Sequence, residues 1–158
     1  FKVAALGTCC EDMWAFPIAA GPTFTQYGRE IGYRFFEPGV EDHWKPLSLL
    51  LNVDRINVPI LIQSPDSEYE GGLDVLELYK HRGKAIELYV LAGEPHVKYQ
   101  PAHRRATYER STEWFQFWLM QRINCDPAKA DQYARWMAMK DAPKAEELRC
   151  ENGASVLP

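Results

Sequence analysis

Residues Val58–His96 read VPILIQSPDSEYEGGLDVLELYKHRGKAIELYVLAGEPH, and this stretch contains the clearest pattern in the chain. Its first run, VPILIQS, is short and apolar, as a buried parallel strand is. The run LDVLELYKHRG has Leu73, Leu76 and Tyr79 at helical spacing, and Gly83 follows as a candidate helix cap. AIELYVLAG then reads as a second strand. The stretch therefore predicts a strand–helix–strand unit with parallel strands.

Charged and polar side chains follow both predicted strands. The turn after the first strand carries Asp66, Glu68 and Glu70, and the second strand leads into the turn Gly-Glu-Pro-His, which ends at His96. Open parallel sheets place their sites at the carboxyl edge, so we expect an acid and the histidine to meet there. An acid followed by a histidine on successive loops is also the order of the last two triad residues in α/β-hydrolases. The pattern predicts an α/β-hydrolase fold with a doubly wound, mostly parallel sheet and flanking helices.

The bulk composition is that of one globular domain. The chain has 158 residues, of which 46% are apolar and 25% charged. Its net charge of −4 argues against a nucleic-acid partner or an anionic membrane surface, and no apolar run approaches the ~20 residues that span a bilayer. The chain begins on a strand-like run without a methionine, so we expect its true N-terminus elsewhere, and the sequence assigns no compartment.

The cysteine pattern does not predict a metal site. The four cysteines, Cys9, Cys10, Cys125 and Cys150, form neither a CxxC pair nor a cluster with histidine at zinc spacing. We therefore expect reduced or buried thiols and no metal. A hydrolase that works with an acid and a histidine also needs no cofactor.

The segments before the quoted stretch are expected to extend the sheet and border the site. Residues 1–8 read as a buried strand, and residues 41–57 read as a helix broken by Pro46. Residues 11–40 are rich in glycine, proline and aromatic side chains, which favours an irregular excursion with one or two short helices. In a hydrolase, such an insertion commonly borders the substrate pocket.

Two helices are predicted in the C-terminal part. The first spans about Arg104 to Ile123, and we expect it to pack on the sheet through an apolar stripe made of Trp114, Phe115, Trp118 and Leu119. The second begins at Pro127, with Asp126 as its N-terminal cap. We assign residues 1–140 to the hydrolase domain and expect residues 141–158 to form a weakly ordered tail.

His96 is the candidate catalytic base. In acyl transfer a histidine takes a proton from a serine hydroxyl and returns it to the leaving amine, while a carboxylate holds the correct tautomer. Asp66 and Glu68 are both candidates for that carboxylate. Asp66 lies closer to the end of the strand, whereas the side chain of Glu68 has an extra methylene that offsets its greater distance from the strand. The remaining histidines are interpreted as structural or surface residues: His43, His81 and His103.

The sequence does not place a serine as the nucleophile. None of the five serines lies in a G-x-S-x-G motif after a strand: Ser48, Ser64, Ser67, Ser111 and Ser155. Ser64 and Ser67 lie on the acid's own loop and cannot also face the histidine. We therefore expect the nucleophile and at least half of the oxyanion hole upstream of Phe1, so that this chain is the C-terminal part of a catalytic domain.

Three segments resemble prolyl-oligopeptidase-type serine peptidases. FKVAALGTCCEDMW resembles the strand after the nucleophile helix, and KPLSLLLNVDRINVPILIQS resembles the lead-in to the acid strand. IELYVLAGEPHVKYQPAHRRATYERSTEWFQFWL is very similar to the histidine segment and the final helix of that family. The resemblance implies a serine hydrolase whose catalytic domain normally follows a β-propeller, with His96 as the triad histidine.

The acid loop departs from the usual family pattern. Those peptidases have His-Gly-x-x-Asp after the acid strand, whereas this chain has Gln-Ser-Pro-Asp-Ser-Glu at residues 63–68. A glutamate in the triad, together with the segment DPAKADQYARW, looks like the lasso-peptide isopeptidases of this family. This resemblance favours Glu68 over Asp66 and implies a Ser-Glu-His triad that opens the isopeptide ring of a threaded lasso peptide through an acyl-enzyme.

Two other functions remain open from the sequence. One is a prolyl oligopeptidase, dipeptidyl-peptidase or acylaminoacyl-peptidase that acts on ordinary peptide bonds. The other is a non-catalytic binding domain on the hydrolase fold, because fold alone does not fix function. In the favoured interpretation the partner is a peptide, admitted through the aromatic-rich residues 11–40.

Overall fold

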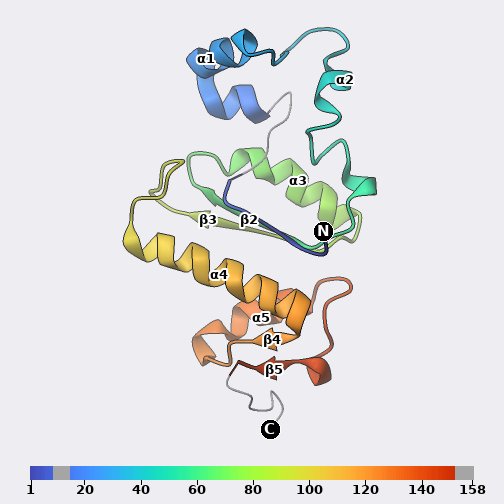
Figure 1. Ribbon diagram of the computed structural model, residues 1–158, viewed down its shortest axis with the longest axis vertical. Coiled ribbons are helices and arrows are strands. Elements are labelled where there is room, and N and C mark those ends of the chain that lie inside the picture. The colour runs from blue at the N-terminus through green and yellow to red at the C-terminus, as the bar shows by residue number, and fades with distance from the viewer. Residues whose placement is uncertain (9–14, 152–158) are drawn as a thin grey trace.

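A three-stranded parallel sheet forms the centre of the computed structural model, which describes residues 1–8 and 15–151 (Figure 1). Its strands are β1 (Ala4–Leu6), β2 (Ile60–Pro65) and β3 (Ile86–Leu91), in the order β1–β2–β3. The helix α3 (Glu70–His81) connects β2 to β3. The strand–helix–strand unit and the α/β fold predicted from the sequence are therefore confirmed.

Helices cover both faces of the sheet (Figure 1). On one face, Ile60 and Ile62 of β2 pack with Val75 and Tyr79 of α3. On the other face, Leu61 packs in a cluster with tryptophans from α4 (Pro101–Met120) and α5 (Ala130–Met137). Because alternate side chains of a strand point to opposite faces, the continuous apolar run ILI fits a strand that is buried on both sides.

Two glycines of the α3 segment differ in what their positions require. A Cβ atom at Gly72 would lie 3.5 Å from Leu88 Cδ1, an ordinary van der Waals distance, so this position faces the sheet but does not need a glycine. Gly83 has a positive φ of 63° just after the helix, which confirms its predicted role as the cap. The predicted apolar face was partly wrong: Tyr79 is buried, but Leu73 is 40% exposed and Val75 takes the buried position.

The helix α4 begins and ends three residues earlier than predicted, at Pro101 and Met120. Trp114 is buried and Trp118 packs against the same cluster, which confirms two members of the predicted stripe and its packing on the sheet. The prediction was wrong for Phe115 and Leu119, which are exposed, and it missed Phe117, which is fully buried. The reason is that α4 lies between the sheet and α5, so its buried side is set by two partners (Figure 1).

A second, two-stranded parallel sheet lies beyond α4 (Figure 1). It pairs β4 (Arg122–Ile123) with β5 (Arg149–Cys150), and the 3-10 helices η2 (Pro127–Lys129) and η3 (Ala145–Glu147) flank α5. Asp126 caps η2 as predicted, because its Oδ1 accepts a hydrogen bond from the Ala128 N–H at 2.9 Å. Residues 145–150, expected to belong to a weakly ordered tail, instead form η3 and β5.

A disulfide joins Cys125 to Cys150, with their Cα atoms 5.5 Å apart. The expectation of reduced or buried thiols is therefore wrong for these two residues. Their separation of 25 residues corresponds to no short cysteine motif from which a disulfide could be predicted. The pairing of β4 with β5 brings the two cysteines together. Cys9 and Cys10 lie outside the described residues.

The segment before β2 contains the helix α1 (Ala15–Glu30), the short helix α2 (Val40–Trp44) and the 3-10 helix η1 (Val53–Arg55). Two helical stretches meet in α1 at a kink, where Gly21 has φ 73° and Pro22 follows. Phe35, Val40 and Trp44 form a small separate core. The prediction of one or two short helices in residues 11–40 agrees with the kinked α1 over its described residues. The helix predicted over residues 41–57 and broken by Pro46 is much shorter than expected, because α2 ends at Trp44 and only the 3-10 helix η1 follows. Within residues 1–8 and 15–151, none of the helices combines the length and apolarity needed to traverse a bilayer.

Candidate active site

The loops that follow β2 and β3 lie side by side at the carboxyl edge of the central sheet. The last residues of the two strands, Pro65 and Leu91, are direct partners in the parallel register. The Asp66 N–H continues the pairing by donating to the Leu91 carbonyl at 3.2 Å. The residues just beyond the strands therefore start from neighbouring positions, as the parallel sheet requires.

Glu68 and His96 contact each other across these loops. The two carboxylate oxygens of Glu68 lie 3.0 and 3.1 Å from His96 Nδ1. The Glu68 side chain is 22% exposed and the His96 side chain 69% exposed. A carboxylate at Nδ1 favours the tautomer with its hydrogen on Nδ1, which leaves Nε2 to accept a proton.

Asp66 makes a different contact. Its Oδ2 accepts a hydrogen bond from the Gly93 N–H at 2.7 Å, three residues before His96. Between Asp66 and Glu68, the Ser67 hydroxyl donates to the Glu94 carbonyl at 3.4 Å. Of the two candidate acids, Glu68 thus meets the imidazole and Asp66 meets the backbone of the loop that carries it.

The loop between β3 and α4, residues 92–100, carries His96 and is called the histidine loop. Two of its charged residues have contacts that were not predicted from the sequence. The Lys98 ammonium donates to the Gly7 carbonyl, which ties the loop to the turn after β1. Burial lowers the pKa of Lys98, and the nearby carboxylates of Glu68 and Glu94 partly offset that effect. Glu94 is itself buried, and one of its oxygens lies 2.8 Å from Nδ1 of His103. A lone lysine or glutamate in a loop gives no periodic or motif signal that would predict these roles.

The described residues do not supply a nucleophile for His96. Among residues 1–8 and 15–151, the hydrogen-bonding partner of the His96 ring is Glu68 and not a serine. Ser64 is fully buried in β2, and the Ser48 hydroxyl accepts from the Leu51 N–H at 3.2 Å. Within the same residues, no three His, Cys, Asp or Glu side chains gather to hold a metal ion.

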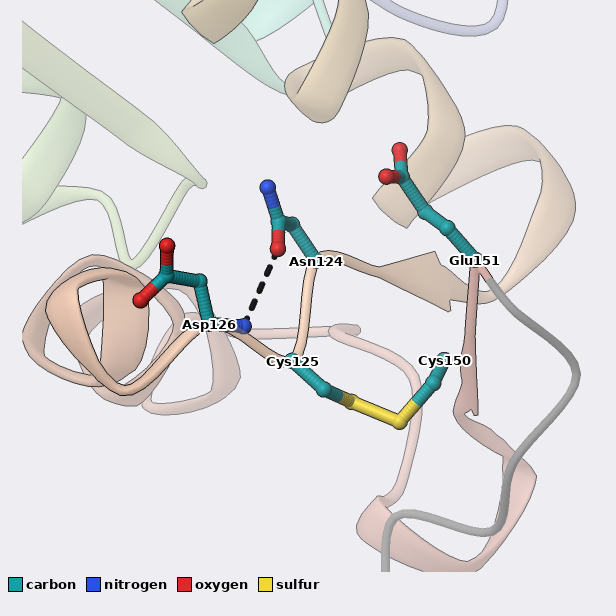
Figure 2. Close-up of a pocket in the computed structure, with 5 residues that line it drawn as sticks. All are labelled: Asn124, Cys125, Asp126, Cys150 and Glu151. Atoms are coloured by element: carbon teal, nitrogen blue, oxygen red, sulfur yellow. Dashed lines mark hydrogen bonds between the residues drawn. A yellow bond between two sulfur atoms is a disulfide. The ribbon is translucent and has the colours of Figure 1, made fainter.

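A pocket also lies beside the disulfide, and Figure 2 shows its lining. The residues around it are Asn124, Cys125, Asp126, Cys150 and Glu151. Asn124 Oδ1 accepts a hydrogen bond from the Asp126 N–H at 3.0 Å, so this lining oxygen already has a partner within the turn. None of these residues belongs to the loops that carry Glu68 and His96, so the pocket is separate from the candidate active site.

The sheet, its flanking helices and the acid–histidine contact at the carboxyl edge define an α/β protein whose candidate site is arranged as in a hydrolase. No protein-family model matches the chain. It is 36% identical over 140 residues, 89% of its length, to lasso peptide isopeptidase AtxE2 of Asticcacaulis excentricus. The resemblance to lasso peptide isopeptidases predicted from the sequence is therefore confirmed.

Solved structures of AtxE2 isopeptidase have the same fold over this region. The apo structure superimposes with a TM-score of 0.79, and a serine-to-alanine variant with Astexin3-dC4 bound superimposes with a TM-score of 0.81. Both are 37% identical to the chain and match 87% of it. The chain spans about a fifth of the length of these relatives, since the matches cover 20% of the curated sequence and 21% of each solved chain.

Proposed function

We propose that this chain is the C-terminal part of the catalytic domain of a serine isopeptidase that opens the ring of lasso peptides. The observation that carries the proposal is the contact of Glu68 with Nδ1 of His96 at the ends of adjacent parallel strands. The similarity of this chain to lasso peptide isopeptidase AtxE2 over 89% of its length supports the substrate class.

In the proposed mechanism, His96 Nε2 accepts the proton of a serine hydroxyl that comes from a segment outside this chain. The serine oxygen attacks the carbonyl carbon of the isopeptide bond. The bond to nitrogen then breaks, and protonated His96 gives its proton to the leaving amine. Glu68 holds the imidazole in the required tautomer and stabilises its charged form.

Water completes the reaction in a second step. His96 removes a proton from the water, which attacks the acyl carbon, and protonated His96 returns a proton to the serine oxygen as the acyl–serine bond breaks. The products are a free N-terminal amine and a free Asp or Glu side-chain carboxylate, so the ring is opened by the net addition of one water. No cofactor enters this sequence of steps.

A peptide partner is supported by the relative that was solved with Astexin3-dC4 bound. That protein carries an alanine in place of a serine, which is the change expected to trap a substrate if a serine is the nucleophile. In this chain, α1 offers exposed aromatic side chains, Phe24 and Tyr27, from the region that we propose borders the entrance. The assignment of residues 1–140 to the hydrolase domain, following an upstream β-propeller, is part of the same proposal.

The proposal is tested by offering the complete protein a threaded lasso peptide and, in parallel, linear proline-containing peptides. We expect the lasso peptide to gain the mass of one water and to lose its ring, as fragmentation by mass spectrometry would show. The matched control is the same protein with His96→Ala. Cleavage of the linear peptides alone would instead identify an ordinary oligopeptidase, and binding without cleavage of either set would identify a binding domain.

A further inference from the structure

A buried carboxylate lies at the base of the loop that carries His96. The side chain of Glu94 has no exposed surface, although it leaves the sheet only three residues after Leu91. Its Oε2 accepts a hydrogen bond from the Tyr99 N–H at 2.8 Å, and its Oε1 accepts from the Gln100 N–H at 3.1 Å. A buried charge of this kind is costly unless hydrogen bonds satisfy it, so its partners indicate its role.

These hydrogen bonds close the loop on itself. Glu94 stands at the start of the loop, and Tyr99 and Gln100 stand at its end, directly before α4 begins at Pro101. The Gln100 side chain reinforces the closure by donating to the Gly93 carbonyl at 3.3 Å. His96 therefore lies on a short loop whose two ends are fixed together, which restricts the positions that its imidazole can take.

The same carboxylate links the loop to α4. Oε1 of Glu94 lies 2.8 Å from Nδ1 of His103, in the first turn of that helix. Because an ionised carboxylate can only accept hydrogen bonds, His103 donates its Nδ1 hydrogen there. The helix α4 packs on the sheet through Trp114, so Glu94 connects the loop of His96 to the core.

We propose that Glu94 is a positioning residue that holds His96 where Glu68 can bind it. This inference rests on the proposed function, because positioning matters for turnover only if His96 is the base. Its structural basis is independent of that function. At the start of the loop that carries His96, Asp66 bonds the Gly93 N–H and Ser67 bonds the Glu94 carbonyl. At the end of the same loop, the Glu94 carboxylate bonds the Tyr99 N–H.

A carboxylate is required because all three partners are donors. In Glu94→Gln, one of the two oxygens becomes an NH₂ group, which is itself a donor. If the amide nitrogen takes the place of Oε2 it faces the Tyr99 N–H, and if it takes the place of Oε1 it faces the Gln100 N–H. In either orientation one of these backbone N–H groups loses the acceptor that closes the loop.

The test compares Glu94→Gln with Glu113→Gln in the complete protein. Glu113 is a matched control because it is also a buried glutamate, bonded to Gln132 at 2.6 Å and to Lys129, but it lies in α4 away from the loops of the site. Two quantities are measured for each variant: kcat and KM for opening a lasso peptide, and the NMR signal of the His96 Nδ1 hydrogen. The second measurement uses ¹⁵N-labelled histidine and needs no substrate.

We expect Glu94→Gln to lower kcat by about 10- to 100-fold with less than about a 2-fold change in KM, and to broaden or shift the Nδ1 signal of His96. The control Glu113→Gln should retain the wild-type kcat and the wild-type Nδ1 signal of His96, once rates are corrected for the folded fraction. Equal loss of kcat in the two variants, or an unchanged Nδ1 signal in Glu94→Gln, would overturn the proposal. If the wild-type protein opens no lasso peptide, the proposed function fails, while the Nδ1 signal still decides whether Glu94 positions His96.

Discussion

Glu68 Oε1 lies 3.0 Å from His96 Nδ1, although the two residues are 28 positions apart in the chain. Their meeting follows from the sheet, because Pro65 and Leu91 are paired at the ends of β2 and β3. Each loop needs only a few residues beyond its strand to bring its side chain to the contact. The geometry of a parallel sheet thus accounts for an acid–histidine pair at this edge.

Substitution of the candidate base tests whether this pair is catalytic. In the complete protein, His96→Ala should lower kcat for lasso peptide opening by about three orders of magnitude, because the proposed mechanism then lacks the base that removes the serine proton. The folded structure should be retained, since the His96 side chain is 69% exposed. Near-normal turnover in a variant with an unchanged circular dichroism spectrum would exclude His96 as the base.

The disulfide between Cys125 and Cys150 should stabilise the C-terminal part of the fold. It closes a loop with a sequence separation of 25 that contains α5, and in the chain-entropy model such a cross-link contributes about 3 kcal/mol. We expect the double variant Cys125→Ala, Cys150→Ala to unfold at a lower temperature and a lower urea concentration than the oxidised protein. Addition of a thiol reductant should lower the stability of the wild type but not that of the double variant. Equal sensitivity of both proteins would contradict this.

Core substitutions test the corrected face of α4. Trp114 is fully buried, its Nε1 donates to the Ala4 carbonyl at 3.0 Å, and its ring packs against Trp136. Trp114→Ala should therefore cost about 4 kcal/mol of unfolding free energy. Phe115→Ala, at a position that the sequence pattern wrongly predicted as buried, should cost about 1 kcal/mol or less. Urea unfolding of the two variants would measure both values, and similar losses would contradict the observed orientation of the helix.

Acid should weaken the fold partly through Glu94. Burial raises the pKa of this carboxyl, but hydrogen bonds from Tyr99, His103 and Gln100 outweigh burial and lower the pKa below its usual value. A group whose pKa is lower in the folded state contributes stability that is full above the unfolded value near ~4.3 and is lost as the pH falls through the folded value.

The measurement is urea unfolding between neutral pH and about pH 3. We expect the decline in stability towards acid to be less steep in Glu94→Gln than in the wild type. The control is Glu70→Gln, an exposed glutamate in the first turn of α3, which should retain the wild-type slope. Parallel curves for the wild type and Glu94→Gln would show that Glu94 does not contribute to the acid sensitivity.

The sequence was sufficient to predict the strand–helix–strand unit and the meeting of its two loops. Both follow from local signals: a short apolar run, helical spacing, a glycine cap and turn residues. The positions of Glu68 and His96 follow in turn, because the carboxyl ends of neighbouring parallel strands lie together. From residues alone the choice between Glu68 and Asp66 stayed open, since it depends on which side chain bonds the loop backbone.

Features that depend on distant contacts could not be predicted. Phe117 is buried because α4 lies between the sheet and α5, and the helical period alone does not specify two partners. The pairing of Cys125 with Cys150 depends on the register of β4 and β5, two strands of only two residues each. The burial of the Glu94 carboxylate could not be predicted either, because it results from the closure of the loop in three dimensions. In the sequence, Glu94 looks like an ordinary charged residue of a turn.

The most direct measurement compares kcat for lasso peptide opening in three variants of the complete protein: Glu68→Gln, Asp66→Asn and Glu70→Gln. We expect the loss to be largest for Glu68→Gln, about 100-fold or more, because this change removes the carboxylate that contacts His96 Nδ1 and, in the proposed mechanism, holds its tautomer. Asp66→Asn should cost less, since an amide oxygen can still accept from the Gly93 N–H, and Glu70→Gln should cost almost nothing. A larger loss for Asp66→Asn than for Glu68→Gln would contradict the central claim that Glu68 and His96 act together.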